Sequence, residues 1–450
     1  MRLTSAWETS DTVFAAASEA MDVRLAVGEP QPLAVAFSGG GDSLFLVVAA
    51  KRWADRRGRR LVALTVDHRV QAASGQWARR CRERCASLGV EHHILDWDGP
   101  RLSGAAAARD VRHALLADAA RERGARVILM GHTKDDLRET RLMRHWGTAI
   151  PDPRTWAPSP AWPEGRGVFI LRPLLGLRRA DLRAALAGLG ETWIDDPLNE
   201  DARFARARAR QSLAEGGNGS VPEAIASPCR LDPRLLEKAR FDAQGVVTIP
   251  RAVLAGEGNR LVGPILVSVS GRRRPPRSRQ MESLGARLRE PGEWVRTLAG
   301  ARVEAGRDTV RVMREPGDMI RTGADLDLEL QAGRPATWDG RFGITAHAAG
   351  LRVRPLAGVA RGLNREDRGR LRATPPAARR ALPAILDAWG ATWRPVGDER
   401  PWVTIEALGP ARLSAAAGCP DRETAVAMRG GSGPGILDGD NSMRRDHEPS

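Results

Sequence analysis

A glycine-rich hexapeptide near the N-terminus has the residue types that bind phosphate. It consists of Ser38, Gly39, Gly40, Gly41, Asp42 and Ser43, between a short apolar run and an apolar-striped helix pattern. The glycines let the backbone adopt positive φ and approach an anion closely, and the first amides of the following helix would face that anion. The loop lacks the lysine of a Walker A loop and the G-x-S-x-G order of a nucleophile elbow. Asp42 alone would repel phosphate, so we predict a Mg²⁺ ion between Asp42 and the phosphate oxygens. The alternative is a tight turn in which Asp42 caps the helix, and the flanking strand and helix patterns disfavour it.

A second segment, residues 131–140, gathers one histidine and several carboxylates. On a helix, His132 and Asp136 are four residues apart, as are Asp135 and Glu139, so the four share one side near the helix N-terminus. Carboxylates at this spacing destabilise an exposed helix, and a metal ion or a cationic substrate would relieve the repulsion. The alternative is an acidic first turn that complements the helix dipole.

Strand and helix patterns alternate around these two segments. Apolar runs at 32–37, 61–66 and 126–131, and a weaker one at 91–95, predict strands buried on both faces. Helical patterns lie between them at 42–54, 74–88 and 105–123, and residues 149–166 predict a long loop. This alternation is typical of βαβ units in an α/β fold with a doubly wound parallel sheet. Ligands bind such sheets at the carboxyl ends of the strands, where both chemical segments begin.

The chain is long enough for several domains. It has 450 residues, and we expect a leader helix at 1–30, an α/β catalytic domain at 31–215, a Gly/Ser/Pro-rich linker at 216–228 and a smaller α+β C-terminal region at 229–429, of one or two subdomains. The Gly-rich and then polar residues 430–450 predict a disordered tail.

The charge balance indicates a polyanionic partner. Seventy basic residues against 55 acidic ones give a net charge of +15, which favours nucleic acid. The four cysteines, Cys81, Cys85, Cys229 and Cys419, are scattered and indicate neither a disulfide framework nor a zinc site. We find no signal peptide and no apolar run of membrane-spanning length, so we expect a cytoplasmic protein without a membrane partner.

The hexapeptide resembles the S-G-G-x-D-S signature of the PP-loop ATP pyrophosphatases, and further blocks resemble the tRNA(Ile)-lysidine synthetases within that superfamily. Residues 131–140 are similar to that family's G-H-x-x-D-D-Q-x-E-T motif, with Leu137 in place of Gln. Four more blocks follow the family's order: 108–113, 172–175, 193–199 and 203–210, similar to A-R-E-x-R-Y, R-P-L-L, W-x-x-D-P-x-N and R-F-x-R-N-x-I-R. Other departures are His113 for Tyr, Ala207 for Asn, and Arg69 where the family has Gly.

The resemblance implies a fold of the adenine nucleotide alpha hydrolase-like type and a specific ligase reaction. ATP would adenylate the wobble cytidine of the CAU-anticodon isoleucine tRNA, and free L-lysine would then form lysidine, with release of AMP and pyrophosphate. A homodimer is possible, since the sequence does not fix the oligomeric state.

The resemblance also suggests roles for particular residues. The hexapeptide would bind ATP, and Asp42 with Asp135 or Asp136 would hold Mg²⁺. Asp136 and Glu139 would bind the lysine ammonium group and assist proton transfer, and Arg112 and His132 would stabilise developing negative charge. The arginines of the last block, Arg203, Arg206 and Arg210, would form one helical face that contacts tRNA phosphates, although a solvated basic helix is the alternative.

Two other functions remain as alternatives. A tRNA thiolation enzyme of the same superfamily would need a reactive cysteine pair, and Cys81 and Cys85 have the wrong spacing for a C-x-x-C motif. A non-catalytic RNA-binding protein would not need the intact hexapeptide or the 131–140 block.

Overall fold

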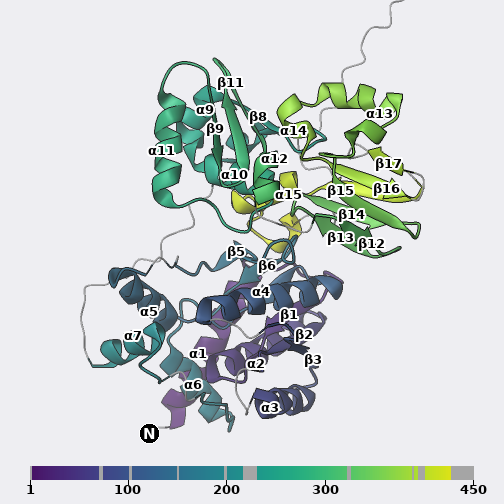
Figure 1. Ribbon diagram of the computed structural model, residues 1–450. Coiled ribbons are helices and arrows are strands. Elements are labelled where there is room, and N and C mark those ends of the chain that lie inside the picture. The colour runs from purple at the N-terminus through teal and green to yellow at the C-terminus, as the bar shows by residue number, and fades with distance from the viewer. Residues whose placement is uncertain are drawn as a thin grey trace, which may run out of the picture. The chain divides into compact units, whose positions relative to one another are not determined.

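The computed structural model describes residues 3–69, 74–100, 104–148, 150, 152–196, 200–215, 231–321, 326–387, 390–393 and 401–426. These residues form two compact units (Figure 1). The first contains residues up to 215 together with 420–426, and the second contains residues 231–419. The linker expected at 216–228 and the tail expected at 430–450 lie outside the described residues.

A six-stranded sheet forms the centre of the first unit, in the order β3-β2-β1-β4-β6-β5. Its strands are β1 (Leu33–Ala36), β2 (Leu61–Asp67), β3 (Glu91–Asp96), β4 (Val127–Leu129), β5 (Trp156–Pro158) and β6 (Phe169–Leu171). Neighbouring strands are parallel except at the edge, where β5 runs antiparallel to β6. The predicted parallel α/β sheet is therefore confirmed. The predicted loop at 149–166 was wrong in part, because it contains the edge strand β5.

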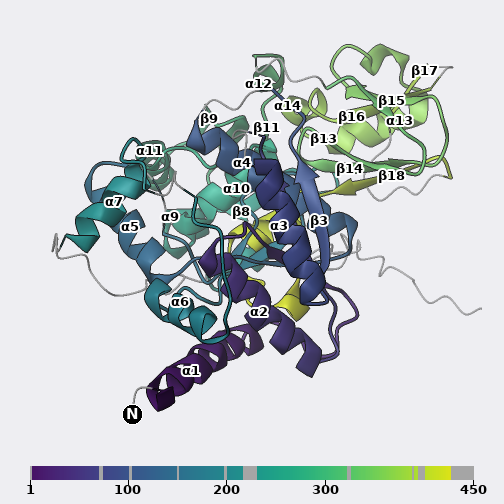
Figure 2. The same cartoon turned by 90° about the horizontal axis from the view of Figure 1, so that it is seen from below.

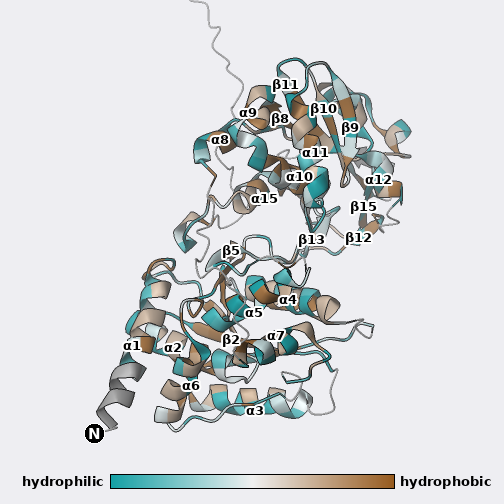
Figure 3. Cartoon of the chain, turned by 90° about the vertical axis from the view of Figure 1, so that its left-hand side faces the viewer, coloured by the Kyte–Doolittle hydropathy of each residue, from teal (hydrophilic) through white to brown (hydrophobic). Residues whose placement is uncertain are grey.

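Seven helices of the first unit are described: α1 (Leu3–Asp22), α2 (Gly41–Arg56), α3 (Ser74–Ser87), α4 (Ala105–Glu122), α5 (Lys134–His145), α6 (Arg179–Gly188) and α7 (Ala205–Ala214). The chain steps from β1 to β2 to β3 and then returns to β4, so right-handed crossovers place α2 and α3 on one face of the sheet and α4 on the other. Figure 3 shows hydrophobic and hydrophilic stretches on the same helices, as expected for helices that cover a sheet. Within this part of the chain, Phe14 of α1 stacks on Phe45 of α2 at 4.5 Å between ring centroids.

The second unit contains three antiparallel sheets with short helices. A five-stranded sheet has the order β7-β8-β11-β10-β9, with β7 (Arg240–Phe241), β8 (Val247–Pro250), β9 (Trp294–Leu298), β10 (Ala301–Ala305) and β11 (Thr309–Arg314). It shares an apolar core with residues of α9 (Arg251–Ala255), α10 (Val262–Ser270), α11 (Ser278–Arg289) and α15 (Gly409–Ala416).

The other two sheets share a second core, which contains the buried rings of Trp338 and Phe342. One sheet has the order β12-β15-β16-β17, with β12 (Leu328–Leu330), β15 (Leu351–Pro355), β16 (Pro383–Asp387) and β17 (Gly390–Trp393). The other has the order β13-β14-β18, with β13 (Pro335–Trp338), β14 (Phe342–Ala346) and β18 (Val403–Ala407). The remaining helices are α8 (Pro233–Glu237), α12 (Pro316–Arg321), α13 (Arg365–Arg370) and α14 (Pro376–Arg379). The predicted smaller α+β C-terminal region is confirmed.

Residues 420–426 return to the first unit. The indole Nε1 of Trp156 donates a hydrogen bond to the Pro420 carbonyl at 2.8 Å. The Glu423 side chain accepts from Arg59 Nη1 at 2.7 Å, and both side chains are 1% exposed. Residues 420–426 therefore pack against the first unit, although they lie far from it in the sequence.

No helix in the described ranges is both long enough and apolar enough to cross a membrane.

Candidate active site

The phosphate loop lies between the end of β1 and the first residue of α2. The Ser43 hydroxyl accepts from the Ser38 amide at 3.2 Å and donates to the Gly40 carbonyl at 2.9 Å, so the loop is closed on itself. Gly39 has φ +83°, and a Cβ there would lie 2.6 Å from Ile194 Cδ1. A side chain at this position would therefore be strained and would clash. Gly40 is the N-cap of α2 and no side chain caps the helix, so its first amides are not used by a protein side chain.

Asp42 does not cap the helix but pairs with a cation. Its Oδ2 accepts from Arg179 Nε at 2.9 Å, while its Oδ1 is buried and has no hydrogen-bond partner in the described part of the chain. Burial raises the pKa of Asp42, and the charge of Arg179 opposes that rise. A buried acceptor without a donor is costly unless a ligand satisfies it. This orphaned oxygen fits a divalent cation, because carboxylate oxygens are the ligands that Mg²⁺ prefers.

The start of α5 uses one oxygen of Asp136 for its own cap. Asp136 Oδ2 accepts from the Thr133 amide at 2.7 Å, in a capping box with the Thr133 hydroxyl. Asp136 Oδ1 lies 3.4 Å from Arg179 Nη2. Burial alone would raise the pKa of Asp136, but the nearby charges of Arg206 and Arg179, together with His132, lower it.

Asp135 connects α5 to the start of α6. Its Oδ2 accepts from the main-chain amide of Arg179 at 2.7 Å and so ties the start of α6 to α5. In the described part of the chain, no three His, Cys, Asp or Glu residues are grouped to hold a metal, so Asp42, Asp135 and Asp136 do not form a complete protein cage. Mg²⁺ commonly needs only one or two carboxylates when substrate phosphates supply the other ligands.

Glu139 is the most enclosed carboxylate of the site, with a side chain that is 2% exposed. Its Oε1 accepts from Arg179 Nη1 and from Arg210 Nε, both at 3.0 Å. Arg206 Nε lies 3.4 Å from the other oxygen, Oε2. Three guanidinium groups therefore meet three carboxylates, since Arg179 also contacts Asp42 and Asp136.

The structure divides the three arginines predicted to form one helical face. Arg206 and Arg210 are on α7, which packs beside α5 in both views (Figures 1 and 2). Arg203 precedes α7, because the helix begins at Ala205, and its Nη2 pairs with Asp201 at 2.6 Å. The three do not share one helical face.

His132 is held in one tautomer by an arginine. Its Nδ1 accepts from Arg172 Nε at 3.2 Å, so the proton of the neutral ring is assigned to Nε2. Burial, reinforced by the charge of Arg172, lowers the pKa of His132 well below its ordinary value. Arg112 is exposed on α4.

The positions that depart from the family motifs fit the structure locally. Leu137, Ala207 and His113 are all buried. Arg69 has φ +50°, the left-handed conformation that glycine adopts most easily. The chain thus keeps the backbone geometry of a glycine at this position although the residue has changed.

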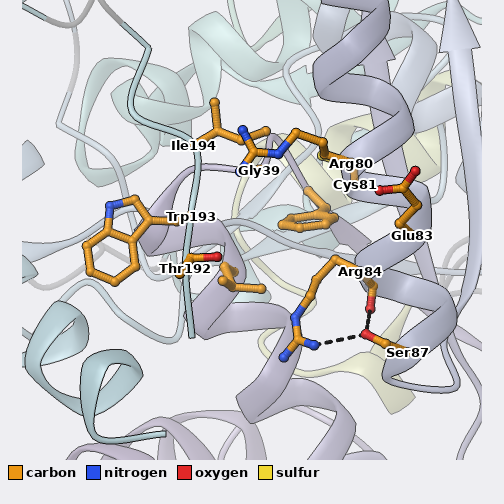
Figure 4. Close-up of a pocket in the computed structure, with 11 residues that line it drawn as sticks. Gly39, Arg80, Cys81, Glu83, Arg84, Ser87, Thr192, Trp193 and Ile194 are labelled. Atoms are coloured by element: carbon orange, nitrogen blue, oxygen red, sulfur yellow. Dashed lines mark hydrogen bonds between the residues drawn. The ribbon is translucent and has the colours of Figure 1, made fainter. Parts of the chain in front are cut away.

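A pocket of about 280 Å³ opens beside the phosphate loop, between α3 and residues 192–194 (Figure 4). The Ile194 amide donates to the Gly39 carbonyl at 2.9 Å, and the Trp193 ring lies 3.4 Å from where a Gly41 Cβ would be. Residues 193 and 194 of the W-x-x-D block therefore pack directly against the phosphate loop. Its last residues, 197–199, lie outside the described residues.

Two arginines of the site were not predicted from the sequence. Arg172 was seen only as part of the R-P-L-L block, and Arg179 was not singled out. The signal that could have found Arg179 is electrostatic, because carboxylates buried this closely require an internal cation.

Comparison with known proteins places this site in a family context. Residues 16–216 match the family model described as the PP-loop domain. A tRNA(Ile)-lysidine synthase of Caulobacter vibrioides is 42% identical over 413 residues, which cover 90% of this chain and 98% of that protein. A tRNA(Ile)-lysidine synthase of Hyphomonas neptunium is 38% identical over 306 residues, which cover 64% of this chain and 83% of that protein. Among solved structures, a U34-tRNA thiolase of Methanococcus maripaludis aligns with a TM-score of 0.38 and 16% identity, covering 47% of this chain and 74% of that chain, a similarity too low to bear on function.

Proposed function

The chain belongs to the tRNA(Ile)-lysidine synthase family, and we propose that it converts the wobble cytidine of the CAU-anticodon isoleucine tRNA to lysidine. Its co-substrates are ATP and free lysine. The proposal rests mainly on one observation: the side chain of Arg179 contacts both a carboxylate of the phosphate loop and a carboxylate of α5. Asp42 of the phosphate loop and Glu139 of α5 both contact Arg179, at 2.9 and 3.0 Å, so a phosphate site and an ammonium site are adjacent.

The first step uses the phosphate loop. The cytosine O2 attacks the α-phosphorus of ATP, a P–O bond forms, and pyrophosphate leaves. The uncapped amides at the start of α2 receive the phosphates. Asp42, whose Oδ1 is buried without a hydrogen-bond partner among the described residues, would hold Mg²⁺, with Asp136 as the second candidate carboxylate. The bound ion would neutralise the charge that develops on pyrophosphate.

The second step uses the carboxylates of α5. The ε-amine of lysine attacks C2 of the adenylated cytosine, the C2–O2 bond breaks, and AMP leaves with the oxygen. Glu139 and Asp136 bind the lysine ammonium groups, and one of them accepts the proton that the attacking amine loses. Neutral His132 offers its Nε2 proton as a hydrogen-bond donor to the developing negative charge, with Arg112 as a second donor.

The two alternatives are less well supported. A thiolation enzyme needs a thiolate, but Cys81 and Cys85 are buried, and burial raises their pKa values to about 11 and about 12. A binding protein without catalysis has no use for a closed phosphate loop beside buried carboxylates.

Further parts of the proposal concern partners and place. The C-terminal region contributes tRNA binding, the enzyme acts in the cytoplasm, and a homodimer stays a prediction that light scattering would test. The test of the central proposal is incubation with isoleucine tRNA transcript, ATP and labelled lysine, followed by mass spectrometry of the nucleosides. The wobble cytidine should gain lysine with loss of water; a thiolated base or an unchanged cytidine would refute the proposed reaction.

A further inference from the structure

The carboxylates proposed to bind lysine are already neutralised by the protein's own cations. Asp42, Asp136 and Glu139 meet the guanidinium groups of Arg179, Arg206 and Arg210, in the ion pairs described above. Glu139 Oε1 already accepts two hydrogen bonds, which is about the capacity of a carboxylate oxygen. The other oxygen, Oε2, is buried without a hydrogen-bond partner among the described residues and lies 3.4 Å from Arg206 Nε. A lysine ammonium group could therefore reach Glu139 only at Oε2, beside the guanidinium group of Arg206. At least Arg206 must move before lysine can bind there.

The three arginines differ in how firmly they are held. The Arg179 side chain is 15% exposed, and its main-chain amide is bonded to Asp135, so both ends of the residue are fixed. The Arg206 and Arg210 side chains are 39% and 33% exposed. Arg206 is 3.4 Å from Glu139 and 3.8 Å from Asp136, which are longer separations than those of Arg179 from Asp42 and Glu139. Arg210 Nε is as close to Glu139 as Arg179 is, at 3.0 Å, and Arg206 Nη2 also donates to Thr140 Oγ1 at 3.4 Å. Because their side chains are more exposed than that of Arg179, the arginines of α7 are the ones that can move.

The helix that carries these arginines does not depend on them for its packing. Ala209 of α7 is buried against Leu142 and Met143 of α5, and Ala207 is also buried. The side chains of Arg206 and Arg210 can therefore swing outward while α7 stays in place. Free lysine competes poorly with groups tethered at the site, because their effective concentration is high. A phosphate backbone competes well for the arginines, since guanidinium binds phosphate in a bidentate manner.

We infer that Arg206 and Arg210 hold the lysine site closed until tRNA phosphates draw them away from Glu139 and Asp136. This inference rests on the proposed function and assigns an order to it: tRNA binds first and thereby creates the lysine site. The nucleophile is admitted only when the cytidine is present. Arg206 and Arg210 thus form ion pairs with α5 when tRNA is absent, and they contact tRNA phosphates when it is bound.

The test measures lysine binding without ATP, so that no turnover occurs. Equilibrium dialysis of labelled lysine against the full chain should give weak binding to the wild type, at least tenfold tighter binding to the R206Q/R210Q variant, and tightening of the wild type when isoleucine tRNA is added. Addition of tRNA should change lysine binding to the variant much less. The matched control is R208Q on the same helix. Arg208 Nη1 donates to the carbonyls of Ala202 and Arg203, so lysine binding should stay at the wild-type level.

Unchanged or weaker lysine binding by R206Q/R210Q without tRNA overturns the inference. If that variant does not fold, the wild type alone decides, since lysine binding that does not respond to tRNA also overturns it. Mass spectrometry of the wild-type product distinguishes failure of this inference from failure of the proposed function. If the enzyme forms lysidine but its lysine binding does not depend on tRNA, the proposed function stands and the closure by Arg206 and Arg210 is refuted. If the modified base contains no lysine, both are refuted.

Discussion

Replacement of Glu423 by Ala should destabilise the first unit, because it leaves a buried guanidinium without its counter-ion. Glu423 accepts hydrogen bonds from both terminal nitrogens of Arg59, and both side chains are 1% exposed. Arg59 lies just before β2, at the amino end of the strand. The proposed chemistry is at the carboxyl ends of the strands, so the substitution should change stability and not the affinity for ATP or lysine.

The expected loss can be estimated from the contacts. Removing one partner of a buried ion pair costs about 3–5 kcal/mol. Arg59 would keep two main-chain acceptors, the carbonyls of Gln31 and Ala26, each at 3.0 Å. Because these two hydrogen bonds remain, we expect the free energy of unfolding to fall by about 3 kcal/mol, the lower end of that range. For a unit of this size, that loss corresponds to a melting temperature lower by roughly 6–12 °C.

The assay is thermal unfolding of the full chain, with a surface pair as control. Lys51 and Asp55 of α2 form an ion pair in which Asp55 is 58% exposed, so D55N should cost less than about 1 kcal/mol. The double variant R59M/E423L should recover most of the loss, since a buried pair can be replaced by apolar groups at little cost. If E423A melts within the range of D55N, then residues 420–426 are not docked on the first unit and the reasoning fails.

Three further predictions concern the site. D42N should lower pyrophosphate release at least ~100-fold in a folded protein, because it removes the charge that would hold Mg²⁺; near-normal release would exclude Asp42 from this role. E139Q should raise the KM for lysine and slow lysidine formation, with ATP-dependent adenylation less affected, and single-turnover measurement of the two steps separates the effects. C81S/C85S should retain lysidine formation, and both native thiols should resist Ellman's reagent at pH 8: with pKa values of about 11 and about 12, they are almost wholly protonated there. Rapid labelling of either thiol, or loss of activity in the double variant, would contradict this.

The sheet was predictable because its signal is local. The runs at 61–66 and 126–131 are continuous and apolar. Strands that are covered by helices on both faces need apolar side chains on both faces, so they form such continuous runs. β5 was missed for the same physical reason. It is an edge strand of three residues that contains a proline, so it lacks an apolar run and resembles a loop.

Long-range ion pairs were beyond the reach of the sequence. Nothing near Glu423 indicates that it pairs with Arg59, 364 residues earlier in the chain. The carboxylates of residues 131–140 were recognised from their spacing, but their counter-cations come from α6 and α7, which only the tertiary fold brings to α5. Helical periodicity places Arg206 and Arg210 near one another, but it does not show whether their side chains contact solvent, tRNA or the carboxylates of α5.

The buried carboxylates also explain why an internal competitor for lysine should exist at all. Asp136 and Glu139 are only 7% and 1% exposed, and an unpaired carboxylate at such depth costs several kcal/mol. A protein that buries its ammonium site must therefore supply cations of its own whenever the substrate is absent. Those cations then oppose the substrate, unless something else removes them. In this chain the more exposed pair lies on α7, the last described element before residue 231, and a polyanionic substrate is the natural agent of removal. Stability of the free enzyme and the order of substrate binding thus have one physical origin.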